Sequence, residues 1–424
     1  MRKLCLMMIL MLIMTSLFFI GNAQAANSIT TIRVWDREVL METTVKMFNQ
    51  KMEKEGKNIR AEFELIPYAQ QVSKFMAALA AGNAPDIYSL DLIQYPYFTS
   101  INAFRDITEE AKALPYFEEL PQQMLKVGMR EGRIYALPSS IDLSSLLWNK
   151  DLFKEAGLDP DKPPATWNEL IEYGKKLTKD LDGDGVTDQW GFAIAGASGG
   201  AYMFWFLPVI WGNGGAMLSD DGMEVLFDSP QNIEAIQFWK DLVYKHKIAP
   251  KSSINWNSGD RYNAFVAGKL AMFLGGNFNI LSLEKDAPNL DYGITFIPKS
   301  ESGQFSSFAG GNLIGITTQS KYPEATWEFI KFYTSEENLI EVWAKQGVLP
   351  IRSSLYENKY FKIRPQYMEF AKFLPVARVP YSTKYNELYD PMQYCMEKAL
   401  LDQMSAEDAV REAAEKMGKV IKSD

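Results

Sequence analysis

The chain has 424 residues, of which 47% are hydrophobic and 23% are charged, and this is typical of a folded globular protein with more than one core. Its net charge of −9 argues against nucleic-acid binding, which depends on a basic surface. The chain contains one histidine, His246, so neither a histidine-based zinc site nor a catalytic triad is expected.

The first residues have the pattern of a secretory signal peptide. Two basic residues precede a nearly unbroken apolar run, 4–20, and an Ala-Gln-Ala cleavage site ends at Ala25. We therefore expect a signal peptide at 1–25, cleavage near Ala25 and a periplasmic protein, with an uncleaved membrane anchor as the alternative. Cys5 lies at the start of the apolar run rather than at the cleavage site, so a lipoprotein is not expected.

The segment that follows alternates strand and helix patterns. Strands are expected at 32–35, 59–65 and 84–91, and the spacing of apolar residues predicts helices over 40–55 and 72–81. This order predicts a parallel sheet with right-handed crossovers. Ligands of such sheets bind beyond the carboxyl ends of the strands.

Polar and aromatic residues occur at those strand ends. Trp35 and Asp36 end the first strand, Gln71 belongs to the cluster that follows the second, and Asp91 ends the third. An apolar ring beside charged groups is unusual for a core. The sequence therefore predicts a ligand-binding edge on this sheet.

A second unit is expected to begin near Pro138. Thr166 and Glu169 have the spacing of a capping box, which predicts a helix from there to Leu177. Two further capped helices are expected at 229–243 and 405–421. Because no disordered linker separates the two halves, we expect crossing strands to join them.

Several motifs occur in an order typical of one family. They include AGNAPDIYSLD, AFVAGKLAMFLGGNFNI and FAGGNLIGITTQSKYPEATWEFI. In these motifs and their spacing the chain resembles the extracellular solute-binding proteins of family 1, the maltose-binding-protein-like receptors of ABC importers, over essentially its whole exported part. The resemblance implies a type II periplasmic-binding-protein fold with two α/β lobes, each a mostly parallel sheet flanked by helices, joined by a hinge. The lobes would hold 26–138 plus 293–346 and 139–292 plus 347–424.

The resemblance also implies a function. A receptor of this kind binds a sugar or oligosaccharide with high affinity outside the cytoplasm and delivers it to the membrane permease subunits of an ABC importer by lobe closure. Such a protein is expected to be a monomer, to catalyse no reaction and to require no cofactor.

The expected ligand-binding residues combine polar groups, which pair with sugar hydroxyls, and flat rings, which cover sugar C–H faces. They are Trp35, Asp36, Gln71, Asp91, Asp142, Trp205, Trp256, Asn277, Phe278, Gly310, Gly311 and Arg352. Phe278 stands where the family often has a stacking tryptophan. Three of these residues have a second interpretation: Trp35 as a core residue, Asp91 as a helix cap and Arg352 as the partner of a surface acid. Trp148, Trp239, Trp327 and Trp343 lie in apolar patterns and are expected in the core.

An Asp-rich loop suggests a structural calcium ion. Asp180, Asp182, Asp184 and Asp188 have the spacing of the first, third, fifth and ninth ligands of an EF-hand loop. The twelfth position is Gly191, where a glutamate is expected, so the alternative is a set of Asx turns without a metal ion.

Two rival functions remain open: an exported enzyme on the same fold and a receptor for another small polar solute, such as a glycerol phosphate or a polyamine. An exported enzyme would need a nucleophile, but Cys395 lies in an apolar helical stretch with no evident base. A receptor for glycerol phosphate would need several cations in its site, where only Arg37 and Arg352 are candidates. A polyamine receptor would need many acids, and the expected aspartates leave that alternative open.

Overall fold

The computed structural model describes residues 29–196 and 198–423, which form two compact units. In the described chain, unit 1 comprises 29–89 and 316–333, and unit 2 comprises 90–315 and 334–423. The signal peptide expected at 1–25 lies outside the described residues. In the part described, no helix has the length and apolar character needed to cross a membrane. The lobe limits expected from the family stay a prediction.

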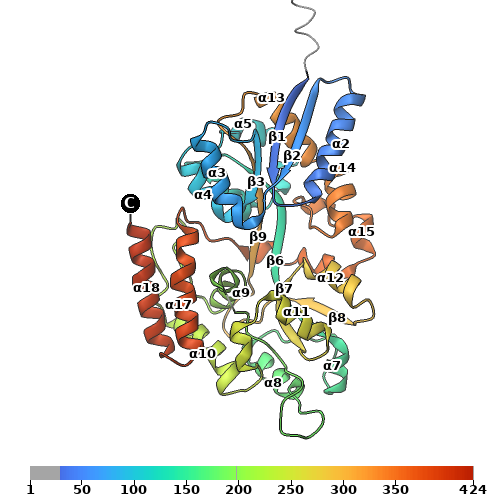
Figure 1. Ribbon diagram of the computed structural model, residues 1–424. Coiled ribbons are helices and arrows are strands. Elements are labelled where there is room, and N and C mark those ends of the chain that lie inside the picture. The colour runs from blue at the N-terminus through green and yellow to red at the C-terminus, as the bar shows by residue number, and fades with distance from the viewer. Residues whose placement is uncertain (1–28, 197, 424) are drawn as a thin grey trace, which may run out of the picture. The chain divides into compact units, whose positions relative to one another are not determined.

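Unit 1 is built on parallel strands, as the sequence predicts. Strand β1 (Thr30–Asp36) lies between β2 (Ile59–Leu65) and β3 (Ile87–Asp91), and all of these pairs are parallel. Helices α2 (Leu40–Lys54), α3 (Gln71–Ala80) and α13 (Pro323–Tyr333) belong to the same unit (Figure 1). Phe48 of α2 packs 5.0 Å from Phe329 of α13, measured between ring centroids, and so joins two distant segments of the chain in one core.

Unit 2 is organised around β6 (Leu137–Asn149), a strand that is buried almost throughout. It pairs antiparallel with β7 (Met272–Gly276), β8 (Tyr292–Thr295) and β9 (Ser307–Ile316). The parallel arrangement expected of each sheet is therefore found in unit 1, while the strands around β6 run in opposite directions.

Short strands and helices complete unit 2. The strands are β4 (Met129–Arg130), β5 (Arg133–Ile134) and β10 (Ala377–Arg378). The helices are α4 (Tyr95–Ser100), α5 (Thr108–Lys112), α6 (Gln122–Val127), α7 (Lys150–Glu155), α8 (Trp167–Leu177), α9 (Gly199–Trp211), α10 (Pro230–Tyr244), α11 (Ser258–Val266), α12 (Asn279–Asp286), α14 (Glu336–Asn338), α15 (Lys359–Lys362), α16 (Pro365–Phe370), α17 (Tyr389–Leu400) and α18 (Ala406–Lys422). The predicted capping box at Thr166 is present, because its hydroxyl accepts a hydrogen bond from the Glu169 amide while the Glu169 carboxylate accepts one from the Thr166 amide.

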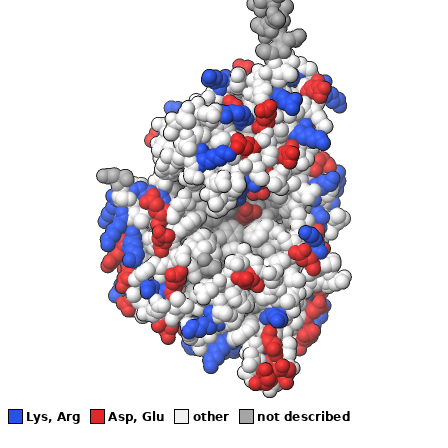
Figure 2. All heavy atoms as spheres, in the orientation of Figure 1, with Lys and Arg blue, Asp and Glu red and all other residues white. Residues whose placement is uncertain are grey.

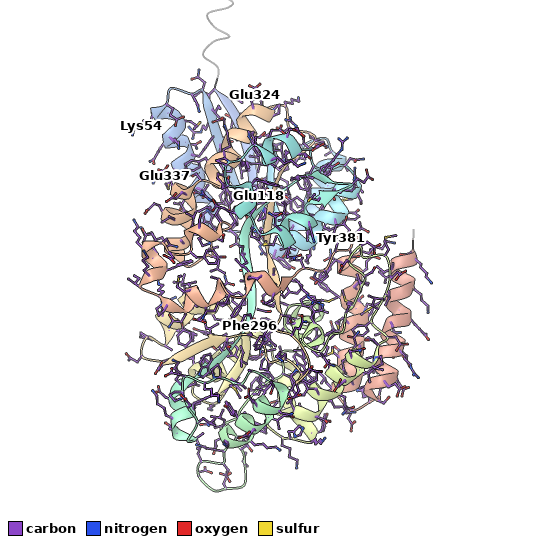
Figure 3. All side chains as sticks on the ribbon, turned by 180° about the vertical axis from the view of Figure 1, so that it is seen from behind. Lys54, Glu118, Phe296, Glu324, Glu337 and Tyr381 are labelled. Carbon is purple, nitrogen blue, oxygen red and sulfur yellow. The ribbon has the colours of Figure 1, made fainter. Side chains whose placement is uncertain are left out.

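The core of unit 2 is rich in aromatic rings. At the edge of this core the half-buried Phe296 (labelled in Figure 3) stacks with the half-buried Phe305 at 4.8 Å and lies 4.2 Å from the buried Phe373, again between centroids. Helices α9, α10, α17 and α18 pack against one another, and Cys395 of α17 is completely buried among them. Burial raises the pKa of this thiol far above its usual range.

The tryptophans expected in the core are mostly there. Trp148, Trp239 and Trp343 are buried, which confirms the prediction for these three. Trp327 is only half-buried; it follows the exposed Glu324 by three residues and so lies on the same side of α13. The spacing of apolar residues along a helix does not predict how wide the buried face of that helix is.

Candidate functional site

Trp35 lies at the end of β1 and is largely covered by other side chains. It is 5% exposed. Tyr88 meets it edge-on with a centroid distance of 5.7 Å, and the Lys74 ammonium lies 4.9 Å from the centre of its ring. A ring held in this way is fixed in place by its neighbours. Its contact with a ligand stays a prediction.

Asp36 follows Trp35 and is completely buried. One oxygen of its carboxyl group accepts a hydrogen bond of 3.0 Å from the Glu38 amide, and the Ser89 side chain bonds it as well. Burial, assisted by the negative charge of Glu38, raises the pKa of Asp36 to about 8. The carboxyl group is therefore mostly protonated at neutral pH, and a neutral carboxyl can donate as well as accept a hydrogen bond.

Gln71 begins α3 close to this strand end and is 1% exposed. Its backbone oxygen accepts a hydrogen bond of 3.3 Å from the Tyr88 hydroxyl, and its side-chain nitrogen has no hydrogen-bond partner among the described residues. Beside it Tyr68 is 54% exposed, and the Arg37 guanidinium lies 5.4 Å from the centre of its ring. Tyr68 belongs to the same cluster after the second strand as Gln71, but it was not among the expected ligand-binding residues.

In unit 2 the structure brings three expected residues together around Phe204. Asp142 of β6 is paired with Gly310 of β9, and a Cβ atom placed on Gly310 would lie 3.6 Å from the Asp142 Cβ and 3.1 Å from the Phe204 ring. Phe204 lies 6.1 Å from Phe278, which is 43% exposed. A half-buried aspartate, a buried glycine next to the Phe204 ring and an exposed ring therefore adjoin. Phe204 was not predicted, because nothing in the aromatic-rich segment 196–215 distinguishes it from Trp205.

Trp205 is 8% exposed and makes a buried contact with Arg261. The Trp205 indole donates a hydrogen bond of 3.1 Å to the Gly275 oxygen, and the Arg261 guanidinium lies 4.4 Å from the centre of a Trp205 ring. Arg261 is completely buried and donates to the Trp256 oxygen at 3.2 Å. Its Nε and Nη2 atoms have no partner among the described residues, and burial lowers its pKa to about 10. It therefore stays charged at neutral pH and links Trp205 to the half-buried Trp256.

Asn277 and Gly311 are both fixed by the backbone of β6. The Asn277 side chain accepts a hydrogen bond from the Leu143 amide at 2.8 Å and donates one to the Ile141 oxygen at 3.1 Å. Gly311 has a φ of +114°, and a Cβ atom there would lie 2.1 Å from the Ser140 oxygen. Both residues thus have structural roles that the sequence did not reveal, and their contact with a ligand stays a prediction.

The contacts of Asp91 and Arg352 match the second interpretation of each residue: Asp91 is a helix cap, and Arg352 is the partner of an acid. Asp91 accepts a hydrogen bond of 3.3 Å from the Ile93 amide and so caps the short helix that follows. Arg352 lies 3.4 Å from a Glu119 oxygen and over the Tyr116 ring, at 4.4 Å from its centre. These contacts do not test whether either residue also binds a ligand.

The Asp-rich loop follows α8 and is exposed. Figure 2 shows acidic side chains gathered at the lower end of that view, where this loop lies in Figure 1. Oxygens of Asp180, Asp182 and Asp188 lie within 4.8 Å of one another. The carboxylates of all four aspartates accept hydrogen bonds from backbone amides of the loop, and that of Asp184, which is not part of this cluster, accepts one from the Val186 amide at 2.7 Å. Three of the four expected carboxylates are thus close enough together to share a cation.

A structural calcium ion in this loop stays a prediction. If it binds there, calcium in excess should raise the melting temperature of unit 2, since an ion at a hundred times its dissociation constant adds about 2.7 kcal/mol. A chelator should reverse the shift, and Asp180→Asn should abolish it while Asp161→Asn, at another exposed position, should not. Identical melting curves in calcium and in chelator would show that the loop holds only Asx turns.

The chain can now be compared with known proteins. Residues 43–369 match the model of a family described as bacterial extracellular solute-binding protein. The chain belongs to this family. Among its relatives is the sn-glycerol-3-phosphate-binding periplasmic protein of Salmonella paratyphi A, which is 26% identical over 365 residues and aligns with 81% of this chain and 78% of its own length.

Solved structures of solute-binding proteins share the fold of this chain. A solute-binding protein of an ABC transporter from Thermotoga lettingae, bound to α-D-tagatose, is 24% identical and superposes with a TM-score of 0.78 over 92% of this chain and all of its own. The cyclic α-maltosyl-1,6-maltose-binding protein of Arthrobacter globiformis gives 23% identity and a TM-score of 0.80 over 93% of this chain and all of its own. The expected solute-binding fold is thereby confirmed, and the family and these neighbours are binding proteins.

Proposed function

We propose that this solute-binding protein captures a sugar or oligosaccharide outside the cytoplasm and delivers it to the permease subunits of an ABC importer. The observation that carries the proposal is the group of Asp142, Gly310 and Phe278 around Phe204 in unit 2. An exposed ring beside a carboxylate offers a flat partner for sugar C–H bonds and an acceptor for hydroxyls. The two structural neighbours described above, one bound to tagatose and one named for a cyclic maltose derivative, support the same class of solute.

A glycerol phosphate is the second candidate solute because one relative is named for it. A phosphate group calls for free cations in the site. The two arginines that the sequence offers are engaged: Arg37 lies 3.2 Å from a Glu38 oxygen and Arg352 lies 3.4 Å from a Glu119 oxygen. Both arginines are thus already paired with a carboxylate, which favours a neutral sugar over a phosphate.

Replacing Phe278 with Ala tests the proposal. The variant should bind its sugar roughly tenfold more weakly, which corresponds to about 1.4 kcal/mol, because the ring that covers the C–H face is lost. Tyr322→Ala is the matched control, since Tyr322 is 42% exposed in unit 1. A thermal-shift screen with monosaccharides, oligosaccharides, glycerol phosphate and polyamines identifies the solute, and titration calorimetry then measures its affinity.

The screen also decides between solute classes. A shift with glycerol phosphate or a polyamine alone would contradict the proposal, as would an unchanged sugar affinity of Phe278→Ala. The remaining parts of the proposal are capture by lobe closure, a monomeric periplasmic protein and cleavage near Ala25. X-ray scattering with and without the sugar, and N-terminal sequencing of the exported protein, measure these directly.

A further inference from the structure

Arg261 is a cation inside unit 2, near the beginning of α11, and it is completely buried. Among the described residues no carboxylate forms an ion pair with it, and its Nε and Nη2 atoms have no hydrogen-bond partner. The neighbouring Asp260 carboxylate instead accepts a hydrogen bond of 2.9 Å from the Asn257 amide. A buried charge without a charged partner is unfavourable, and a cation near the beginning of a helix also meets the positive end of the helix dipole. We therefore expect an apolar side chain of similar size to be at least as favourable for folding.

The contacts that Arg261 does make fix the position of Trp205. Its Nη1 atom donates a hydrogen bond of 3.2 Å to the Trp256 oxygen, and this bond orients the guanidinium group. The guanidinium carbon then lies 4.4 Å from the centre of the Trp205 ring, while the indole nitrogen of Trp205 donates to the Gly275 oxygen at 3.1 Å. A planar cation against the ring and a hydrogen bond at its nitrogen together hold the indole in one orientation.

Trp205 in turn adjoins the exposed ring of Phe278 by two routes. Gly275 belongs to β7, against which both α11 and α12 pack (Figure 1). A Cβ atom on the next residue, Gly276, would lie 2.5 Å from the Phe278 ring, so this ring rests directly on the backbone that follows Gly275. Trp205 also meets Phe204 edge-on at 5.2 Å, and Phe204 lies 6.1 Å from Phe278. A shift of the Trp205 indole would therefore disturb the support of Phe278.

We propose that Arg261 is a positioning residue of the sugar site, which holds Trp205 and thereby keeps the Phe278 ring in the orientation that binds the solute. The inference rests on the proposed sugar-binding function and adds a residue that acts on the affinity without contacting the sugar. Arg261 improves binding although its buried charge does not favour folding, so a substitution should separate affinity from stability.

Thermal unfolding and titration calorimetry of Arg261→Met test the proposal. Methionine is apolar and unbranched, so the variant removes the charge and the bond to the Trp256 oxygen while it fills much of the same space. The unliganded variant should melt at the temperature of the wild type or higher. It should bind sugar about tenfold more weakly, because the Phe278 ring is no longer held in one orientation. The probes are maltose, maltotriose, mannobiose and D-tagatose, and the one that binds the wild type most tightly is used throughout.

Two further variants serve as controls. Arg411→Met makes the same chemical change on α18, where the arginine side chain is 57% exposed, and should alter neither the melting temperature nor the affinity. Arg261→Lys keeps a cation that can lie over the Trp205 ring but lacks the planar guanidinium group. It should recover part of the affinity that Arg261→Met loses.

A double-mutant cycle with Phe278→Ala tests the route of the effect. If Arg261 acts through the Phe278 ring, Arg261→Met should weaken binding by less than about threefold once that ring is absent, against about tenfold when it is present. A residue that only supports the fold of unit 2 would weaken binding by the same factor in both backgrounds.

The outcomes separate the two proposals. Unchanged affinity in Arg261→Met, equal losses in both backgrounds or equal affinities of the Met and Lys variants would overturn the role of Arg261 and leave sugar binding intact. An Arg261→Met protein that melts at a lower temperature or does not fold would overturn it as well, because Arg261 would then support the fold itself. If none of the four probes and no sugar of the thermal-shift screen binds the wild type, both proposals fail.

Discussion

Replacing Asp36 with Asn should stabilise unit 1 at neutral pH and remove a pH dependence that the wild type shows. The pKa of Asp36 is about 8 in the folded protein because of burial, against about 3.9 in an unfolded chain. Between these values the folded protein holds a proton that the unfolded chain has lost, so the stability falls as pH rises, by about 1.4 kcal/mol per pH unit. The contribution of Asp36 to the free energy of unfolding is fully present below about pH 4 and is lost above about pH 8. Asparagine keeps the oxygen that accepts from the Glu38 amide and does not titrate.

Denaturation by urea at several pH values between about 4 and 8 measures this slope. The variant Asp36→Asn should lose it, whereas Asp161→Asn, at an exposed carboxyl whose pKa is lowered by Lys150, should keep it. Equal slopes in the wild type and in Asp36→Asn would show that Asp36 is ionised when folded. A protonated Asp36 would also mean that the buried end of β1 holds a hydrogen-bond donor where the sequence indicates only an acceptor.

The second large effect is expected at Gly311. A Cβ atom there would lie 2.1 Å from the Ser140 oxygen and 2.7 Å from its carbonyl carbon, and the φ of +114° is a conformation that other residues rarely adopt. The clash is between two backbones, β9 against β6, so no side-chain rotation relieves it. Gly311→Ala should therefore lower the free energy of unfolding of unit 2 by roughly 3 kcal/mol or more.

Gly200→Ala is the matched control for that substitution. A Cβ atom on Gly200 meets nothing closer than 3.8 Å, and the residue lies in the first turn of α9. Its melting temperature should stay close to that of the wild type. A Gly311→Ala variant as stable as Gly200→Ala would mean that β9 can move away from β6 at little cost.

The local features of the fold could be predicted from the sequence. The alternation and spacing of apolar residues predict β1, α2, β2 and α3 to within a few residues, and Thr166 marks the beginning of α8. The directions of the strands around β6 could not be predicted in this way. A strand buried on both faces has a continuous apolar run whether its neighbours are parallel or antiparallel.

The site was predicted less completely because its contacts join distant parts of the chain. Nothing near Trp35 in the sequence indicates that Lys74 and Tyr88 cover its ring. The sequence near Asn277 likewise does not indicate that its side chain forms hydrogen bonds with the backbone of β6. Phe204 lies in the proposed sugar site only because Gly310 of β9 leaves room for its ring. Residue type predicted which groups are polar or aromatic, and the fold determined their neighbours.

The burial of Cys395 has a practical consequence. It is the only cysteine in the described part of the chain and lies completely inside unit 2, so thiol reagents have no accessible target there while the protein is folded. A single cysteine introduced at an exposed position, such as Leu181, would therefore be labelled selectively without first removing the native one. A fluorophore attached in this way offers a route to an optical sensor for whichever solute the protein captures.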